Sequence, residues 1–317
     1  MDENQFKNLA EDAPFELSPV MPTMLPGDKV IQFRCHKDVG CWNACCSNID
    51  ITLTPYDILR LKNRLEMSSG DFLKTYTVPY EMDQDGTPGV KFRPVEGGTA
   101  CQFMRPEGCS VYEDRPTACR YYPVALLSMR NQEEYVDRTA YALVQEPHCW
   151  GHKEPQSQTI DEYRKDQGVD VYDEKGRGWR QLVLKKKSAG PAIGKPPAIS
   201  NQLFFMASYD VDRFRAFVSS DSFNKSYDVP LEVMATLLAD DEAMLEFGFN
   251  FLKHALFGER FLEEQPGAYE ERMARLKSRA EAIRAEYQAD RDRLEDEKYA
   301  EPGRPGDLSC NAGKDCG

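Results

Sequence analysis

The sequence lacks the features of several common protein classes. Its 317 residues contain no run approaching the ~18 apolar residues that a transmembrane helix needs. The first residues, MDENQFKNLAEDAPFEL, have neither the positive start nor the apolar stretch of a secretory signal. Acidic residues outnumber basic ones by 53 to 40, and the one basic run, at 185–187, is short. We therefore expect a cytoplasmic protein that binds neither nucleic acid nor membranes.

The chain also lacks the short motifs that mark nucleotide and radical enzymes. There is no G-x-G-x-x-G after a strand pattern, no G-x-x-x-x-G-K-[ST], and no C-x₃-C-x₂-C run. Built-in hydride or nucleotide chemistry is therefore not expected. An apolar content of 41% is enough for a real hydrophobic core, so the fold should not need cysteine cross-links to be stable.

Cysteine is absent from residues 150–309 but concentrated before them. Two cysteines, Cys310 and Cys316, lie in a glycine-rich tail, and the other eight lie between 35 and 149. In a reducing compartment such thiols favour metal binding or redox chemistry over disulfides. We therefore take all eight as candidate metal ligands: Cys35, Cys41, Cys45, Cys46, Cys101, Cys109, Cys119 and Cys149.

These eight cysteines form two groups in the sequence. The first is Cys35-x₅-Cys41-x₃-Cys45-Cys46, and the second is Cys101-x₇-Cys109-x₉-Cys119 with Cys149 further on. Two sets of four thiolates suit either tetrahedral zinc or an iron–sulfur cluster. Only Cys41-x₃-Cys45 has the short spacing of a zinc knuckle, so the irregular spacings favour a cluster, of the 4Fe–4S type, over zinc.

The adjacent pair Cys45–Cys46 constrains the geometry. Neighbouring side chains point to opposite faces of a strand and diverge by roughly a hundred degrees in a helix. The pair is therefore predicted to serve two different centres, or to provide one ligand and one buried thiol.

Residues with other metal-site roles flank the cysteines. A group of basic residues in an otherwise acidic protein would compensate thiolate charge: Arg34, Lys37, Arg105, Arg115 and Arg120. His36, His148 and His152 lie next to cysteines or near them and could complete a Cys₃His zinc site, although a role outside the ligand set is favoured for each.

The remaining pattern predicts an α+β protein: a loop-rich cysteine-cluster metal-binding module followed by a mostly helical C-terminal region and a long charged helix. Thr54-Pro55-Tyr56-Asp57 predicts a capped helix to about residue 65, and a second short helix is expected from Ser69. A helix start is expected over 114–120 and a turn-rich separator over 83–98. A helix with Thr159 as its cap is expected over 159–187, interrupted by Gly168, Gly176 and Gly178.

Five segments are predicted from these patterns. We expect a cysteine-cluster module (1–155), a helical connector with a Gly/Pro linker at 188–200 (156–200), an apolar helical region (201–262), a long charged helix (263–300) and a flexible tail (301–317). Short helices are predicted over 210–218 and 240–257. Apolar residues follow a heptad seam over 268–298, which would allow contact with a protein partner or self-association, although folding back onto its own domain is slightly favoured.

The stretch CQFMRPEGCSVYEDRPTACRYYPVAL (101–126) resembles the YkgJ-type cysteine-cluster family. Its signature has a cysteine group ending in CC, then C, C-x-x-Y-x-x-RP-x-x-C-R-x-x-P, and the resemblance covers about residues 33–150. The matching positions are Cys45-Cys46, Cys101, Cys109, Tyr112, Arg115-Pro116, Cys119-Arg120 and Pro123. The resemblance implies a zinc- or iron-chelating domain.

The first cysteine group departs from the usual C-x-x-C-x-x-CC because Cys35 and Cys41 are five residues apart. With GCWNACC, it is similar to the cysteine group of flagellin lysine methylases, which hints at protein modification. The main hypothesis is thus a metal-binding (iron–sulfur or zinc) protein, with redox or protein-modification chemistry. The alternatives are a structural zinc module that serves as an adaptor for protein partners and, with less support, a thiol redox switch.

Overall fold

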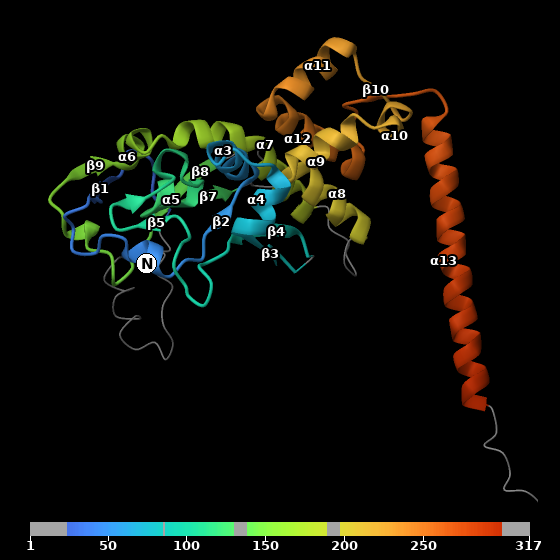
Figure 1. Cartoon of the computed structure of the whole chain (residues 1–317), viewed down its shortest axis with the longest axis horizontal. Helices are drawn as coiled ribbons and strands as arrows, with labels where there is room; N and C mark the ends of the chain where they lie inside the picture. The colour runs from blue at the N-terminus through green and yellow to red at the C-terminus, as the bar shows by residue number, and fades with distance from the viewer. Residues whose placement is uncertain (1–23, 85, 130–137, 189–196, 300–317) are drawn as a thin grey trace, which may run out of the picture. The chain divides into compact units, whose positions relative to one another are not determined.

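The computed structural model describes residues 24–84, 86–129, 138–188 and 197–299 (Figure 1). Their contacts divide into a first unit, Met1–Asn224 with Val229–Leu262, and a second unit, Lys225–Asp228 with Glu263–Gly317. The finer division into five segments stays a prediction. The expected linker lies mostly in 189–196 and the expected tail in 300–317, and both ranges fall outside the described residues.

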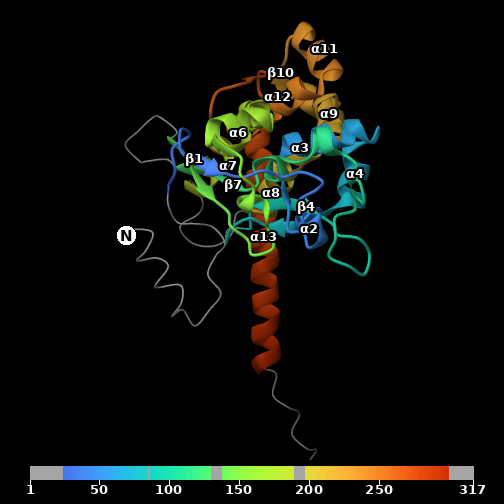
Figure 2. The ribbon, with the colours of Figure 1, turned by 90° about the vertical axis from the view of Figure 1, so that its left-hand side faces the viewer.

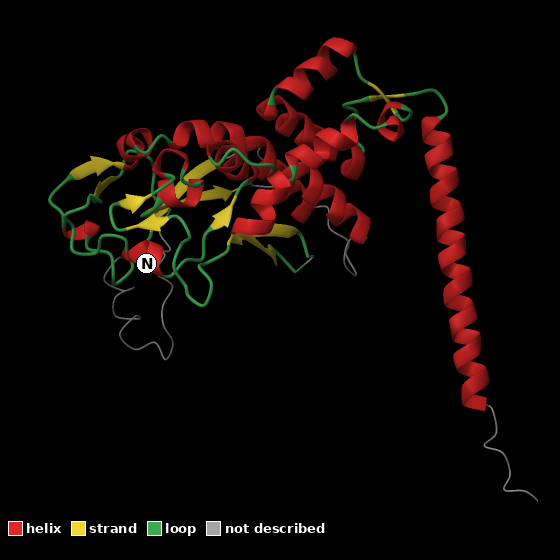
Figure 3. Ribbon diagram, viewed as in Figure 1, coloured by secondary structure: helices red, strands yellow, loops and turns green. Residues whose placement is uncertain are grey.

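The α+β class predicted from the sequence is confirmed. Most of the strands are short and accompany long loops in the cysteine-bearing part of the chain, and helices dominate the chain after Thr159 (Figure 3). Every strand pairing within the described residues is antiparallel. In the cysteine-bearing part, β4 (Pro88–Phe92) lies between β2 (Thr52–Leu53) and β3 (Thr77–Glu81). The other pairs there are β1 (Val30–Gln32) with β9 (Ser157–Thr159), β5 (Met104–Arg105) with β6 (Gly108–Cys109), and β7 (Val124–Met129) with β8 (Arg138–Leu143).

The helix α3 (Pro55–Arg64) begins where the sequence predicted it. Thr54 accepts a hydrogen bond from the Asp57 N–H, and the Asp57 carboxylate accepts one from the Thr54 N–H, which completes a capping box. The helix α4 (Ser69–Tyr76) also starts at the predicted residue. Figures 1 and 2 both show α3 between α4 and α7 (Val169–Ser188), and it packs against both.

Three sequence expectations need correction. The separator at 83–98 contains β4, the central strand of a three-stranded sheet. The helix expected from residue 114 is a 3₁₀ turn, Tyr112–Asp114, followed by α5 (Thr117–Tyr121). Of the three glycines expected to interrupt 159–187, only Gly168 does so, between α6 (Ile160–Asp166) and α7.

Two hydrophobic regions support the first unit. One contains Phe33 on the chain leaving β1, Tyr121 in α5 and Tyr163 in α6, and the partly buried Cys149 packs against it. The other joins the helices from α8 to α12, whose buried aromatic rings pack in tilted and edge-to-face pairs. These helices are α8 (Ala198–Tyr209), α9 (Val211–Val218), α10 (Asp221–Asn224), α11 (Leu231–Ala239) and α12 (Asp241–Phe257).

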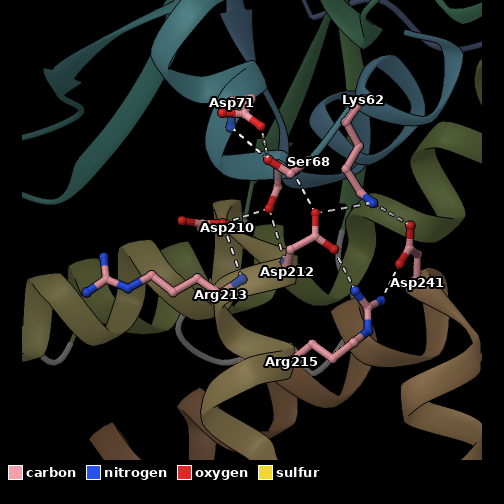
Figure 4. A network of polar contacts seen from close by, with 9 residues as sticks. Lys62, Ser68, Asp71, Asp210, Asp212, Arg213, Arg215 and Asp241 are labelled. Carbon is pink, nitrogen blue, oxygen red and sulfur yellow. Dashed lines mark hydrogen bonds and ion pairs between the residues drawn. The ribbon is translucent and has the colours of Figure 1, made fainter. Parts of the chain in front are cut away.

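A polar network joins α3 to α9 and α12 (Figure 4). The buried Lys62 ammonium lies 2.8 Å from an oxygen of Asp241 and 3.5 Å from one of Asp212, and Arg215 pairs with both carboxylates. Burial opposes ionisation of the two aspartates, but hydrogen bonds and the charges of Lys62 and Arg215 outweigh it and lower the pKa of each. The network therefore holds the cysteine-bearing part against the helices.

The second unit consists of β10 (Tyr227–Asp228) paired with β11 (Glu263–Glu264) and the long helix α13 (Ala268–Tyr299). Seam residues such as Met273, Ile283 and Leu294 are exposed. No helix in the described ranges combines the length and the apolar character that crossing a bilayer requires.

Candidate metal centre

The eight candidate ligands all lie in described residues and none forms a disulfide. Cys35 and Cys45 are exposed, and the other six are half-buried. Most lie in loops or at the ends of short elements: Cys35 follows β1, Cys45 and Cys46 lie in α2 (Ala44–Ser47), and Cys109 ends β6. The cysteines therefore form a thiol-rich surface region and are not part of the hydrophobic core.

Backbone contacts bring Cys35, Cys41 and Cys149 together. The pairing of β1 with β9 continues into a hydrogen bond of 3.1 Å from the Arg34 N–H to the Gly151 carbonyl. The Trp150 N–H lies 3.2 Å from the Cys41 sulfur and donates to it. Residues far apart in the chain thus meet next to the start of the cysteine-rich loop.

A second set of contacts gathers Cys46, Cys101 and Cys109. The Cys101 N–H donates to the Cys46 carbonyl across 2.8 Å, so α2 lies directly beside the 101 loop. The β5–β6 hairpin then pairs Met104 with Cys109 and turns the chain back toward Cys101. These two contacts place three of the sequence-predicted ligands in one region.

Cys119 reaches this second region through α5. The Thr117 N–H and hydroxyl both donate to one oxygen of Asp57, at 2.8 and 2.7 Å, and Asp57 is fully buried. This pins the first turn of α5 to the start of α3. Cys101 and Cys109 both lie within electrostatic reach of the Cys119 thiol.

The vicinal pair does not diverge as the sequence analysis predicted. The Cys45 and Cys46 sulfurs lie 3.9 Å apart, in van der Waals contact. Asn43, which precedes α2, has a left-handed backbone with φ 65°, and its side chain donates to the Arg105 carbonyl, so a tight local turn folds both thiols to one side. Zn–S bonds of about 2.3 Å give S–S edges of roughly 3.8 Å in a tetrahedron, so adjacency alone does not exclude a shared ion.

The thiols strongly influence one another's protonation. With Cys46 as the donor, its hydrogen bond lowers the pKa of Cys45 to about 7 and raises that of Cys46. Cys35 is exposed as a residue, but the surrounding chain desolvates its thiol; this desolvation is the main reason that its pKa is raised to about 11, and neighbouring thiols raise it further. Burial is also the largest cause of the raised pKa of Cys101, Cys109, Cys119 and Cys149. A bound cation would reverse this balance, since metal binding stabilises thiolates and releases their protons.

Two of the five predicted basic residues act on the thiols. Arg115 lowers the pKa of Cys35 and Cys109, and Arg105 that of Cys101 and Cys109, although burial outweighs both. The buried Arg115 guanidinium is fixed by the Tyr112 carbonyl at 2.9 Å and the Gln167 side chain at 2.6 Å.

The other three basic residues have other surroundings. Arg120, also buried, donates to the backbone carbonyls of Glu113, Arg115 and Gln167, and thus supports the loop. Arg34 and Lys37 are exposed. Of the five predicted basic residues, Arg105 and Arg115 are therefore the two that lie near enough to favour ionised thiols.

The histidines near the cysteines have partners other than the thiols. His36 lies 3.1 Å from a Glu154 oxygen, His152 lies 3.0 Å from the Val144 carbonyl and against the Phe33 ring, and His148 lies 3.5 Å from Glu146. These contacts agree with the favoured interpretation that the histidines lie outside the ligand set.

Tyr122 lies beside the candidate ligand Cys149, and the sequence analysis gave it no role. Its hydroxyl is buried without a partner at hydrogen-bonding geometry among the described residues, and it lies next to Cys149 and Glu146. Burial and these two neighbours raise its pKa, so the hydroxyl keeps its proton and can donate toward sulfur. Within the motif, an aromatic residue beside Pro123 is indistinguishable from a core residue, so the sequence offered no signal.

The fold brings the thiols into one region, but it does not direct their sulfur atoms toward one shared position. In the described ranges, no group of three or more His, Cys, Asp or Glu residues is arranged to hold a metal ion. The donor set nevertheless fits the ions in question, because thiolate sulfur is the soft ligand that zinc and iron–sulfur clusters take. The eight thiols, with Arg105 and Arg115 beside them, form a thiol-rich module whose donor type suits these ions.

The comparisons agree with this class. Residues 34–149 match the CxxCxxCC family, described as "Putative zinc- or iron-chelating domain", so this part of the chain is a domain of that family. The match begins one residue before Cys35 and ends at Cys149, and it therefore contains all eight candidate ligands while covering well under half of the chain. No curated protein and no solved structure gives a match.

Proposed function

We propose that the cysteine module binds iron in a 4Fe–4S cluster and uses it for redox or protein-modification chemistry. The observation that supports this most is the position of the thiols at the surface, with Cys35 and Cys45 exposed. Structural zinc sites are closed, four-coordinate units. A cluster that exchanges electrons or contacts a protein substrate needs access, and exposure is one of the factors that set its potential.

The supply of ligands from separate elements supports a cluster as well. The thiols come from the loop after β1, from α2, from the β5–β6 hairpin, from α5 and from the turn before residue 150. The edges of a cluster accept ligands from several directions, whereas most zinc sites use paired knuckles. The likeness of the first cysteine group to flagellin lysine methylases supports protein modification as the chemistry.

A structural zinc module that acts as a protein adaptor is the second candidate. It is favoured by the shortness of the elements that carry the thiols: α2 has four residues and β5 and β6 two each. Such elements gain most from metal cross-links, worth roughly 10–16 kcal/mol per zinc site by analogy with zinc-finger peptides.

A thiol redox switch is a weaker candidate, supported by the contact of Cys45 with Cys46 and the lowered pKa of Cys45. Eight unpaired thiols support a reducing, cytoplasmic location for each candidate.

Anaerobic purification of the full chain tests these candidates. We expect a brown, oxygen-labile protein that contains iron and acid-labile sulfide. Replacement of Cys45, Cys101, Cys109 or Cys119 by serine should remove most of the bound metal. The same replacement of Cys310 or Cys316 serves as the matched control and should leave the metal content unchanged.

Each other result has a definite meaning. A colourless protein with stoichiometric zinc would refute the iron–sulfur proposal and support the adaptor. A metal-free protein whose thiol count falls on mild oxidation would support the switch. Full metal retention in all four module variants would refute the ligand assignment itself.

The helix α13 is the part of the chain that we propose meets a protein partner or a second copy. Its exposed Met273, Ile283 and Leu294 support this. Sedimentation of the full chain beside an Ile283→Glu variant tests self-association, and equal monomer masses for both would refute it.

A further inference from the structure

We propose that α13 binds an acidic amphipathic helix of another protein and forms a coiled coil with it. This partner is a narrower form of the contact role proposed for α13, on which it rests. The arrangement of charge along α13 is the observation that selects an acidic partner over a second copy of the chain.

The apolar seam of α13 is exposed. The helix is continuous from Ala268 to Tyr299 (Figure 1). From residue 273 onward, the seam positions a and d that the structure describes are Met273, Ala280, Ile283, Tyr287, Asp290 and Leu294. The four large apolar side chains among them are between 46% and 73% exposed. Apolar groups so exposed at heptad spacing gain from being covered by a second helix.

Basic residues lie on both sides of this seam. Positions e and g of a heptad flank the seam and determine which partner a helix takes. Five of the seven e and g positions described from residue 270 to 293 are basic, in a chain whose net charge is −13: Lys277, Arg279, Arg284, Arg291 and Arg293. The positions away from the seam carry three acidic residues, Glu271, Glu281 and Asp292, and one basic residue, Arg275. The charges of α13 are therefore sorted by face.

Most of these flanking charges have no partner within the described residues. Arg293 lies 3.2 Å from an oxygen of Asp290. The other four basic residues beside the seam form no ion pair with a described residue. Solvated helices often carry opposite charges four residues apart, which stabilise the helix by itself. Beside the seam of α13 the positive charge is instead left for a second helix to meet.

A second copy of α13 would meet these charges poorly. In a parallel pair, position g of one helix faces position e of the next heptad of the other, so Arg279 would face Arg284. That repulsion offsets the attraction between Glu286 and Arg291. In an antiparallel pair e positions face each other, and Glu270 is the only acidic residue among the described ones. An acidic partner instead turns all five basic positions into contacts between opposite charges.

A bilayer is another surface that a basic amphipathic helix can meet. Two features of α13 oppose it. The apolar residues form a narrow a and d stripe, and Asp290 lies within that stripe, where its carboxylate would enter the apolar layer. In a pair of helices, a single polar seam residue instead fixes the register of the partner.

Two synthetic peptides test the proposal against the full chain. Both carry isoleucine at position a and leucine at position d; one has glutamate at every e and g position, and its matched control has lysine there. Fluorescence anisotropy of the labelled peptides measures binding. We expect the acidic peptide to bind at least about tenfold more tightly than the basic one. This preference should shrink between roughly 0.05 M and 0.5 M salt, because the contacts are exposed and screened.

Three variants of the chain locate the binding surface. Arg284→Glu should weaken binding of the acidic peptide by about threefold to tenfold. Arg275→Glu makes the same charge change away from the seam and should leave that binding unchanged. Ile283→Glu removes an apolar seam residue and should abolish binding of either peptide.

Other results would overturn the acidic partner. Equal binding of the two peptides, no binding of either, or equal effects of Arg284→Glu and Arg275→Glu would each do so. Dimers of the full chain that Ile283→Glu disrupts, without a preference for the acidic peptide, would assign the seam to a second copy and leave the contact role of α13 intact. Binding to phosphatidylserine vesicles but not to the acidic peptide would assign it to a membrane. The metal content of the chain is measured separately, so failure of the metal proposal would be recognised independently.

Discussion

Asp57 links the start of α3 to the helix that carries Cys119, and its removal should measurably destabilise the protein. Its side chain is fully buried and accepts three hydrogen bonds of 2.7–2.8 Å, from the Thr54 N–H and from the Thr117 N–H and hydroxyl. Asp57→Ala leaves these three donors without an acceptor. Each unsatisfied buried donor costs about 1–3 kcal/mol.

The expected loss lies at the lower end of the sum of these costs. The Thr117 hydroxyl can rotate toward another acceptor, and removing a carboxylate whose pKa burial raises relieves a desolvation penalty. We therefore expect Asp57→Ala to lower the free energy of unfolding by roughly 3 kcal/mol. Asp57→Asn retains one acceptor oxygen and should lose less.

Urea unfolding at neutral pH, followed by far-ultraviolet circular dichroism, measures this loss. Asp50→Ala is the matched control: its carboxylate pairs with Lys91 but is 76% exposed, so we expect a change under about 1 kcal/mol. If Asp57→Ala unfolded within about 1 kcal/mol of wild type, or no differently from Asp50→Ala, the pinning role of Asp57 would be refuted.

Two further predictions concern the ion-pair network around Lys62 and the Tyr122 hydroxyl beside Cys149. Lys62→Met should cost about 1–2 kcal/mol, since its two aspartate partners keep Arg215 and are partly solvated. Folding lowers the pKa of both aspartates, so their stabilising contribution is complete above the ordinary pKa of about 3.9 and is lost as the pH falls through the folded values. The difference in unfolding free energy between wild type and Lys62→Met should therefore become smaller when urea titrations are repeated at acid pH. A difference that does not change with pH would contradict this. Tyr122→Phe removes the hydroxyl beside Cys149 and should weaken zinc binding at the site that contains Cys149 by about tenfold in a chelator competition. Tyr287→Phe, in the exposed part of α13, is the control and should leave the zinc affinity unchanged. An unchanged affinity in Tyr122→Phe would exclude a hydrogen bond from its hydroxyl to that site.

The sequence predicted correctly those elements that depend only on residues close together in the chain. The Thr54 capping box and the Gly168 break need only neighbouring residues, so both were found. Gly178 was misread because the reason for it is tertiary: a Cβ there would lie 3.0 Å from the Phe249 ring of α12, so the glycine permits close helix packing inside α7. The strand β4 was missed because GVKF lies between turn residues and is defined only by its pairing with β2 and β3.

The candidate site was predictable in its residue types but not in its geometry. Cysteine spacing singled out the eight thiols as candidate ligands, because thiols grouped so densely need an explanation. The direction of the Cys45 and Cys46 side chains was predicted wrongly, because the left-handed Asn43 and its bond to Arg105 turn the short helix in a way that ideal helix or strand geometry does not contain. Tyr122 required the position of Cys149, which is brought near only by the fold.

The contacts that hold the cysteine-bearing segments in place are made mostly by groups other than the cysteine side chains. This leads to a last prediction. Asp57 fixes α5, Arg120 fixes the loop before it through three carbonyls, and the helices pack through buried side chains such as Phe214 and Leu252. Removing the metal with a chelator should therefore loosen α2 and the 101 loop but leave α3, α7 and α12 folded. Hydrogen exchange would then rise near the cysteines alone. Cooperative unfolding of the whole first unit would mean instead that the metal holds the fold together, as the structural zinc alternative requires.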